Sequence, residues 1–162
     1  MDEEHVDRQV SRLEAESLEL DQLLEETVRI VHESNPKFHW TGIYELFPDG
    51  ILRLGPFLGA ATEHVSIPVG QGVCGSAVAE KRNKVISDVT QEANYLACSI
   101  FTKSELVVLI QKNGKIYAEI DIDSHNSDAF DQRTVEIVQK VADRLAIAYE
   151  ARSRQVRNLL EH

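Results

Sequence analysis

Residues 105–123 read ELVVLIQKNGKIYAEIDID, and this stretch decides the fold of the chain. Its two apolar segments flank Asn113-Gly114, a dipeptide typical of two-residue β-hairpin turns because both positions accept the positive φ angles of such a turn. We therefore predict strands at residues 105–111 and 115–123. Because strands joined by a tight turn run antiparallel, the hairpin predicts an antiparallel sheet.

Working outward from the hairpin, four further segments are predicted to be extended. They alternate apolar and polar residues or are short and bounded by turn residues, and they lie at residues 38–46, 51–59, 65–69 and 84–89. Pro48-Asp49-Gly50 is a turn signal between the first two segments. A short helix is predicted at residues 73–80, whereas residues 90–103 lack a clean period and are predicted to form a loop.

Long helices are predicted at both ends of the chain. Residues 2–33 carry apolar residues at alternating spacings of four and three, which is the pattern of one helical seam. Asn35-Pro36 ends this helix, because the residue before proline disfavours the helical conformation. A second long helix is predicted from residue 128 to about residue 160. Two such helices can cover one face of a sheet, and their length favours contact with a second copy of the chain.

Length, composition and charge limit the classes of protein to which the chain could belong and the partners it could bind. The 162 residues suffice for a single domain with a sizeable core. A net charge of -10 would repel nucleic acids and anionic membranes, so neither is expected as a partner. No apolar run approaches the roughly 20 residues needed to span a bilayer, and the polar, acidic N-terminus is unlike a signal peptide. We therefore expect a cytoplasmic protein.

Both cysteines of the chain lie in residues 67–98. Cys74 follows Gly-Gln-Gly at a predicted helix start, where amide groups and the helix dipole would lower the pKa of a thiol. The alternative is that a small buried residue is needed there. Cys98 lies in the predicted loop and is either a reactive group or a filler of the core. Two cysteines are too few for a disulfide scaffold or a four-cysteine zinc site.

Three acidic residues are predicted to gather at one end of the hairpin. Asp121 and Asp123 are two residues apart in a strand and therefore point to the same face. If Asn113-Gly114 is the turn, Glu105 lies opposite residue 122 and diagonal to both aspartates. Because three carboxylates repel one another, such a cluster would favour a cation, either a substrate ammonium group or a metal. The alternative is a solvated strand end, and no histidine has metal-ligand spacing to this group.

Two aromatic residues are predicted to share one face of the first strand. Trp40 and Tyr44 are four residues apart, with Gly42 between them. They are interpreted either as an aromatic wall of a small-molecule pocket or as ordinary core. The sequence alone does not separate these two interpretations.

Eight segments together resemble one known family. In chain order they are WTGIYEL, LRLGPFLG, SIPVGQGVCGSAVA, ISDV, YLAC, SELVV, NGKI and IDIDS. Over residues 36–150 they resemble the GAF-domain free methionine-(R)-sulfoxide reductases. The resemblance implies an α+β, GAF-like fold, with an antiparallel six-stranded sheet and long N- and C-terminal helices on one face. It implies one domain over residues 1–162, with a helix at 1–35, the sheet and pocket at 36–127, and a helix at 128–162.

The resemblance also implies roles for individual residues. Cys98 matches the catalytic cysteine and Cys74 a resolving cysteine, which would form a disulfide after reduction of free L-methionine-(R)-S-oxide. The pocket residues of the family match Trp40, Tyr44, Glu105, Asp121 and Asp123. A thioredoxin-like dithiol would then reduce the disulfide, so neither a cofactor nor a metal is expected. A homodimer through the terminal helices is expected as well.

The chain departs from the family pattern near the expected active site. His64 stands where many relatives carry a third cysteine, and Asn94-Tyr95 replaces a Gly-His pair before the catalytic cysteine. A second hypothesis is therefore a non-catalytic GAF module that binds a small molecule or mediates dimerisation in signalling. A cyclic nucleotide fits poorly, because three carboxylates would repel its phosphate. Attachment motifs for a bilin or haem are absent from the sequence.

Overall fold

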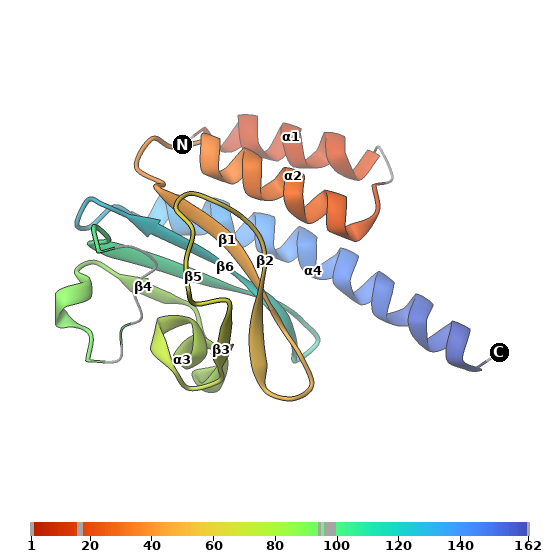
Figure 1. The fold of residues 1–162 in the computed structure, drawn as a ribbon. Helices are drawn as coiled ribbons and strands as arrows, with labels where there is room; N and C mark the ends of the chain where they lie inside the picture. The colour runs from red at the N-terminus through yellow and green to blue at the C-terminus, as the bar shows by residue number, and fades with distance from the viewer. Residues whose placement is uncertain (1, 16–17, 94, 96–99, 162) are drawn as a thin grey trace.

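The computed structural model describes residues 2–15, 18–93, 95 and 100–161. Within them the chain forms a six-stranded sheet in the order β3-β2-β1-β6-β5-β4, and every neighbouring pair is antiparallel. Figure 1 shows helices on both sides of this sheet, which confirms the predicted α+β class and the antiparallel six-stranded arrangement. The strands are β1 Trp40–Leu46, β2 Ile51–Leu58, β3 Ser66–Pro68, β4 Lys84–Ile86, β5 Ser104–Lys112 and β6 Lys115–Ser124.

The central hairpin of β5 and β6 turns where the sequence predicts, but its register differs by one residue. Asn113 and Gly114 take positive φ angles of 53° and 78°, as a tight turn requires. The register then shifts between Ile110 and Gln111, so that Glu105 pairs with Asp123 rather than with residue 122. The predicted register was wrong because an irregularity inside a strand leaves no clear mark in the sequence. The shift determines the face of the sheet on which Glu105 lies, because a slip of one residue moves a side chain to the other face.

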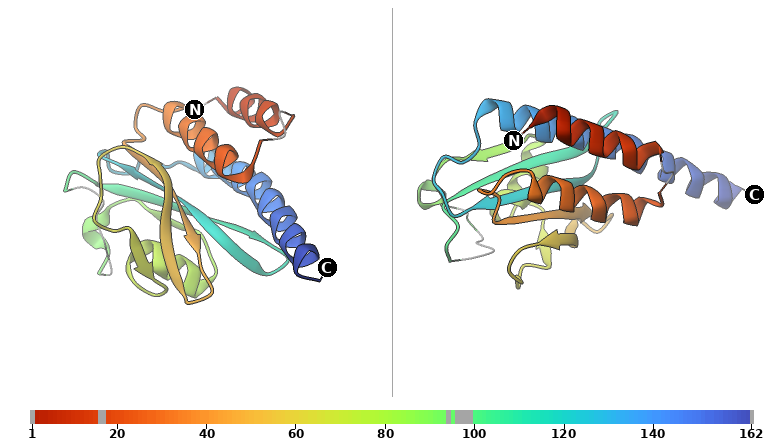
Figure 2. Two further views of the ribbon diagram at one scale, coloured as in Figure 1. Left: turned by 45° about the vertical axis from the view of Figure 1, so that its right-hand side comes forward. Right: turned by 90° about the horizontal axis from the view of Figure 1, so that it is seen from above.

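The N-terminal part of the chain forms two helices instead of the predicted single one. Helix α1 spans Glu3–Ala15 and α2 spans Leu20–Glu33, and Figure 2 shows them side by side and antiparallel. The apolar residues of α1, among them Val6 and Val10, are buried within this chain in the core that α2 and the sheet also form. Folding back lets both halves of the apolar seam contact the same core, which a straight helix could not do.

The C-terminal helix α4, Gln132–Glu161, lies across β5 and β6 on the same side of the sheet as α1 and α2. It begins after Asp131, whose Oδ1 accepts a hydrogen bond of 2.8 Å from the amide of Thr134. The C-terminal end of the helix projects past the sheet (Figures 1 and 2). Leu159 and Leu160, in this projecting end, are 78% and 82% exposed. In the described ranges, no helix has the length and apolarity needed to cross a membrane.

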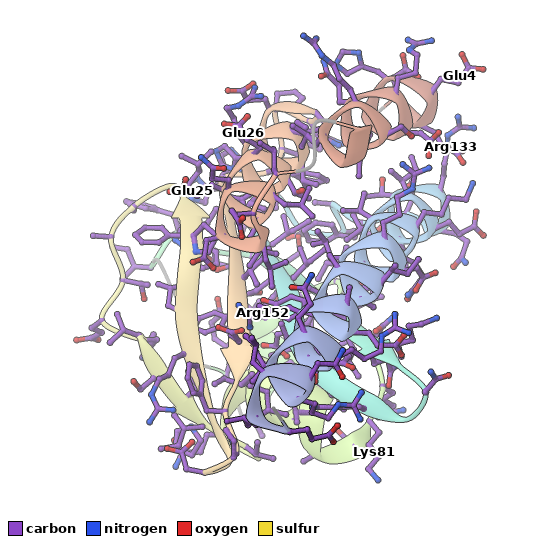
Figure 3. The ribbon with its side chains drawn as sticks, turned by 90° about the vertical axis from the view of Figure 1, so that its right-hand side faces the viewer. Glu4, Glu25, Glu26, Lys81, Arg133 and Arg152 are labelled. Carbon is purple, nitrogen blue, oxygen red and sulfur yellow. The ribbon has the colours of Figure 1, made fainter. Side chains whose placement is uncertain are left out.

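The opposite side of the sheet carries helix α3, Gly72–Glu80, and a single 3₁₀ turn, Val89–Gln91. Figure 3 shows this division from the side: Lys81, which follows α3, lies at the other end of the molecule from Glu4 of α1. The sheet therefore separates two cores. One packs against α1, α2 and α4, and the other lies between the sheet and α3.

Candidate functional site

The candidate site lies on the face of β1, β6 and β5 that α3 covers. Trp40 pairs with Asp123, Gly42 with Asp121 and Tyr44 with Glu119. On the other side of β6, the shifted register pairs Glu105 with Asp123. Directly paired residues of antiparallel strands share a face. The structure therefore places Trp40, Tyr44, Glu105, Asp121 and Asp123 on one face of the sheet.

Four carboxyl groups are buried on this face among the described residues. The exposed fractions are 3%, 0%, 1% and 2% for Glu105, Glu119, Asp121 and Asp123. Within the described part of the chain, neither oxygen of Glu119 or of Asp121 has a hydrogen-bond partner. Burial raises the pKa of Asp121 and raises that of Glu119 well above its usual range. The burial of all four carboxyl groups excludes the alternative of a solvated strand end. Asp121 and Glu119 therefore retain their protons at a pH where exposed carboxyl groups have lost them.

Cys74, in the first turn of α3, points into this acidic cluster. Its Sγ lies 3.9 Å from Oε1 of Glu105, and one polar atom each of Cys74, Glu105 and Asp121 lie within 4.8 Å of one another. Burial and then the charges of Asp121, Glu119 and Glu105 raise the pKa of the thiol. The predicted lowering of this pKa is wrong, because burial and three nearby acids outweigh the helix N-terminus.

The two aromatic residues are held rigidly beside the carboxyl groups. The rings of Trp40 and Tyr44 stack with their centroids 6.2 Å apart. Trp40 donates a 3.0 Å hydrogen bond from Nε1 to the carbonyl of Ala60, and Tyr44 donates one of 2.7 Å to that of His64. Gly42 makes room for this arrangement, because a Cβ there would lie 2.4 Å from the Trp40 ring. Both aromatic residues are fully buried, and Tyr44 also lines the cavity at Cys74.

A small cavity of about 10 Å³ separates α3 from the acidic face. This is about the room that one water molecule needs. The sheet side of the cavity carries carboxyl groups and Tyr44, and the α3 side carries the Cys74 thiol and Val73. This combination suits a small organic cation with an apolar part. The same three polar groups are close enough to ligate a metal ion. The cavity is lined by Tyr44, Ile67, Gly72, Val73, Cys74, Glu105 and Asp121.

The predicted nucleophile, Cys98, lies outside the described residues, as does Asn94. Tyr95 is described, and its side chain packs against the core that contains Cys74 and Tyr44. Sequence reasoning missed Glu119, which the structure buries completely on the same face. The signal was available, because the alternation of Asp121 and Asp123 extends back to Glu119 with the same period of two.

Comparisons with known proteins agree on the family. The sequence profile of the GAF domain matches residues 19–149. Protein YtsP of Bacillus subtilis is 37% identical over 117 residues, which cover 72% of this chain and 71% of that protein. The free methionine-R-sulfoxide reductase of Escherichia coli is 39% identical over 101 residues, 62% of this chain. These residues span 60% of the Escherichia coli protein, less than two thirds of its length.

Among solved structures, this chain is similar to the free methionine-R-sulfoxide reductase of Staphylococcus aureus. The reduced form superposes with a TM-score of 0.84 at 32% identity and covers 91% of this chain and 94% of that chain. The complex of the same protein with its substrate superposes with a TM-score of 0.82 at 32% identity, covering 91% of this chain and 95% of that one. The similarity therefore includes both the helical layer and the α3 side of the sheet.

Proposed function

The chain belongs to the GAF domain family, and from this premise we propose that it reduces free L-methionine-(R)-S-oxide to methionine. Relatives and structural neighbours named as free methionine-R-sulfoxide reductases support the proposal. The observation that carries it is a thiol, Cys74, buried among carboxyl groups and beside stacked aromatic rings on one sheet face. Such a cluster suits a substrate that brings its own positive charge.

Recognition would depend on the ammonium group of a free amino acid. Glu105 and Asp121 face the cavity and would bind this cation through charge-assisted hydrogen bonds. Their ionisation would follow from the arrival of the charge, since a nearby cation lowers the pKa of a carboxyl group. Methionine within a peptide lacks this ammonium group, so the acidic cluster favours the free amino acid. Tyr44 and Trp40 would offer an apolar surface to the methylthio end of the ligand.

The proposed chemistry begins at Cys98. Its thiolate attacks the sulfoxide sulfur, and a carboxyl group of the buried cluster that still holds its proton supplies it to the oxygen. The sulfur–oxygen bond of the substrate breaks, methionine leaves, and Cys98 becomes a sulfenic acid. Cys74 then attacks this sulfur, water departs and a disulfide forms. A thioredoxin-like dithiol, present in a reducing compartment such as the cytoplasm, would restore both thiols.

The decisive experiment measures methionine released from methionine-(R)-sulfoxide by the reduced protein with a dithiol reductant. We expect release by the unsubstituted chain, none by Cys98→Ser, and at most one equivalent by Cys74→Ser. Two matched compounds serve as controls: the (S) epimer tests stereochemistry, and the N-acetylated sulfoxide removes the ammonium charge. The proposal fails if the fully reduced, unsubstituted chain releases no methionine.

One observation favours a second candidate function. The raised pKa of Cys74 makes it a poor nucleophile in the resting protein, as expected of a non-catalytic GAF module that only binds a small molecule. Calorimetry with methionine and with its sulfoxide separates the two candidates. Binding of the sulfoxide without any methionine release would establish the module and exclude the reductase.

We also propose that two copies associate through the terminal helices. Among the described residues, their large exposed apolar side chains are Ile147, Val156, Leu159 and Leu160, all of α4. The charged residues Glu25, Glu26 and Arg152 lie on the same helical layer in Figure 3. The double substitution Leu159→Glu with Leu160→Glu should yield a monomer in sedimentation velocity. If the unsubstituted chain is already monomeric, or the variant remains dimeric, this interface is wrong.

A further inference from the structure

Three side chains that can bind a metal ion converge on the cavity beneath α3. The Sγ of Cys74 lies 3.9 Å from Oε1 of Glu105, and one ligand atom from each of Cys74, Glu105 and Asp121 lies within 4.8 Å of the other two. The exposed fractions of these residues are 5%, 3% and 1%, and all three line the same cavity. Among the described residues, no other group of three or more such side chains brings its ligand atoms this close together.

Asp121 gives an independent sign that a ligand belongs in this cavity. Both of its carboxyl oxygens are buried and have no hydrogen-bond partner in the described ranges. A buried polar group without a partner destabilises a fold, and buried charges in proteins are paired or coordinate metals. Among the described residues that line the cavity, none is a lysine, an arginine or a histidine. A cation that satisfies Asp121 would therefore come from outside the chain.

The fold holds the three ligands in place. Asp121 lies two residues before Asp123, the strand partner of Glu105, so the carboxyl groups of Glu105 and Asp121 are diagonal neighbours on one sheet face. Cys74 comes from the first turn of α3, which packs tightly against β3. A Cβ on Gly75 would lie only 2.6 Å from a carbonyl oxygen of β3. Ligands supplied by packed strands and a packed helix start are oriented before any ion arrives.

The donor set and the available room select a zinc-type ion. Thiolate ligands favour Zn²⁺, whereas Mg²⁺ and Ca²⁺ favour oxygen ligands. Zn²⁺ is often held in a tetrahedron by three protein ligands and one water, and the cavity of about 10 Å³ has room for one water. Sulfur and oxygen ligands of such a tetrahedron are about 3.6 Å apart, close to the 3.9 Å between Sγ and Oε1. Ca²⁺ needs about six to eight ligands and Mg²⁺ keeps several waters, so neither ion fits.

We propose that Cys74, Glu105 and Asp121 form a binding site for a zinc-type divalent cation. On binding, the Cys74 thiol loses its proton to solvent, and its sulfur and one oxygen of each carboxylate bond to the ion. No electrons are transferred, so the step needs neither an oxidant nor a reductant. The thiolate and two carboxylates carry three negative charges, two of which the ion offsets. All three ligands lie within the described residues, and the site does not depend on Cys98.

The bound ion would exclude the substrate, a consequence that rests on the proposed function. Glu105 and Asp121 are the carboxyl groups to which that function assigns the substrate ammonium group. Two cations that require the same carboxylates cannot share a cavity with room for one water. Because the thiolate is the metal ligand, a disulfide at Cys74 would also abolish the site. The zinc-type ion is therefore an inhibitor that binds only while Cys74 is reduced.

The experiment measures the binding of Zn²⁺ to the reduced, metal-free full chain by calorimetry. Co²⁺ serves as a second probe, because a thiolate-to-cobalt charge-transfer absorption reports directly on a sulfur ligand. The variants Cys74→Ser and Asp121→Asn each remove one ligand with little change of shape. Cys98→Ser is the matched control for the thiol, and Asp143→Asn, on the exposed surface of α4, is the matched control for the carboxylate.

We expect one Zn²⁺ to bind per chain, and Co²⁺ to give the charge-transfer absorption. Loss of an outer-shell partner already weakens metal binding about 10–100-fold, so loss of a ligand in Cys74→Ser or Asp121→Asn should weaken it at least about 100-fold. Cys98→Ser and Asp143→Asn should bind Zn²⁺ as the unsubstituted chain does. A measurement without variants covers the case in which a variant fails to fold: Zn²⁺, but not Mg²⁺, should slow alkylation of Cys74 in the unsubstituted chain, read by peptide mass spectrometry.

The possible results separate the metal site from the proposed function. Methionine should weaken Zn²⁺ binding more than alanine does, since alanine has the same ammonium and carboxylate groups but no methylthio end. If Zn²⁺ binds through Cys74 but the metal-free chain releases no methionine from the sulfoxide, the metal site stands and the reductase fails. If methionine binds without weakening Zn²⁺ binding, the exclusion is overturned. If Co²⁺ gives no charge-transfer absorption, or Cys74→Ser keeps its affinity for Zn²⁺, the metal site is overturned whatever the activity.

Discussion

The two faces of the central hairpin are equally buried and chemically opposite. The helix-covered face, which packs against α1, α2 and α4, is apolar throughout and consists of Leu106, Val108, Ile110, Ala118, Ile120 and Ile122. The pocket face, under α3, alternates with it along the same strands and carries Glu105, Glu119, Asp121 and Asp123. One backbone thus presents a hydrocarbon surface on one side and carboxyl groups on the other.

The difference shows that burial alone does not indicate what a residue contributes. On the helix-covered face, each apolar side chain removed from water stabilises the fold by about 1.5–3 kcal/mol. On the pocket face, burial of a carboxyl group raises its pKa and opposes folding at neutral pH, as for Glu119. The stability supplied by the helix-covered face offsets the cost of the buried carboxyl groups on the pocket face, which only a ligand or a reaction requires. Substitutions on the helix-covered face should therefore reduce stability, whereas substitutions on the pocket face should reduce activity.

The largest effect is expected on the helix-covered face. Ile120→Ala removes a side chain that is 2% exposed in the core under the helices, and should reduce the free energy of unfolding by about 2–5 kcal/mol. Denaturant titration measures this loss. The folded fraction should retain its kcat/KM for methionine-(R)-sulfoxide. A large change in kcat/KM without a loss of stability would contradict the division between the faces.

The corresponding change on the pocket face should affect function instead. Asp121→Asn keeps the shape of a buried side chain but removes its charge, so kcat/KM for methionine-(R)-sulfoxide should fall about 100-fold. The midpoint of denaturant unfolding should stay the same or rise, because a costly buried carboxyl group is gone. The N-acetylated sulfoxide serves as the control, since a substrate without an ammonium group should lose much less. Equal losses of kcat/KM for both compounds would contradict the proposed contact between Asp121 and the substrate ammonium group.

A stabilising substitution on the pocket face would sharpen the contrast. Glu119→Leu replaces an unpartnered, fully buried carboxyl group by an aliphatic side chain in an apolar core. The free energy of unfolding should increase by about 1–3 kcal/mol. Denaturant titration measures this gain. A decrease in stability would indicate that Glu119 is paired in the folded protein.

The smallest effect expected is a dependence of stability on pH. Because the folded-state pKa of Glu119 is raised, its stabilising contribution is complete below the unfolded value of 4.5 and is lost as the pH rises through the folded value. The melting temperature should therefore fall as the pH rises above 4.5 and through the folded-state pKa, and Glu119→Gln should reduce this slope.

The contribution of His32, on the helical side, to stability changes with pH in the opposite direction. Burial lowers the pKa of His32, so its contribution is present above 6.5 and is lost as the pH falls. Its effect is small because the ring is only half-buried. Substitution of His32 by asparagine should leave the slope at high pH unchanged. If this substitution flattens the slope at high pH as much as Glu119→Gln does, the assignment to the pocket face is wrong.

Much of the fold was predictable because it is encoded locally. Asn113-Gly114 predicted the central hairpin, and both strands beside it form at the expected residues. The common face of Asp121 and Asp123 follows from the period of two within β6, and that of Trp40 and Tyr44 from the same period within β1. These inferences need only the geometry of a single strand.

Other features could not be predicted, because they depend on contacts between distant segments. The register shift between Ile110 and Gln111 brings Glu105 onto the face of Asp123, and no residue type near it marks the irregularity. The break between α1 and α2 follows from the packing of both helices into one core. The raised pKa of Cys74 results from acids on β5 and β6, far from it in the chain.

The sequence by itself therefore determined the elements, the antiparallel hairpin and the residue types of the site, because turn chemistry and periodicity act over a few residues. Tertiary structure alone decided which side chains meet and what their protonation states are. It placed Glu119 beneath α3, buried the acidic cluster and reversed the expected effect on the Cys74 thiol. The physical reason is that burial and the proximity of charges are properties of the assembled layers, and they set the pKa of a group more strongly than its neighbours in the chain do.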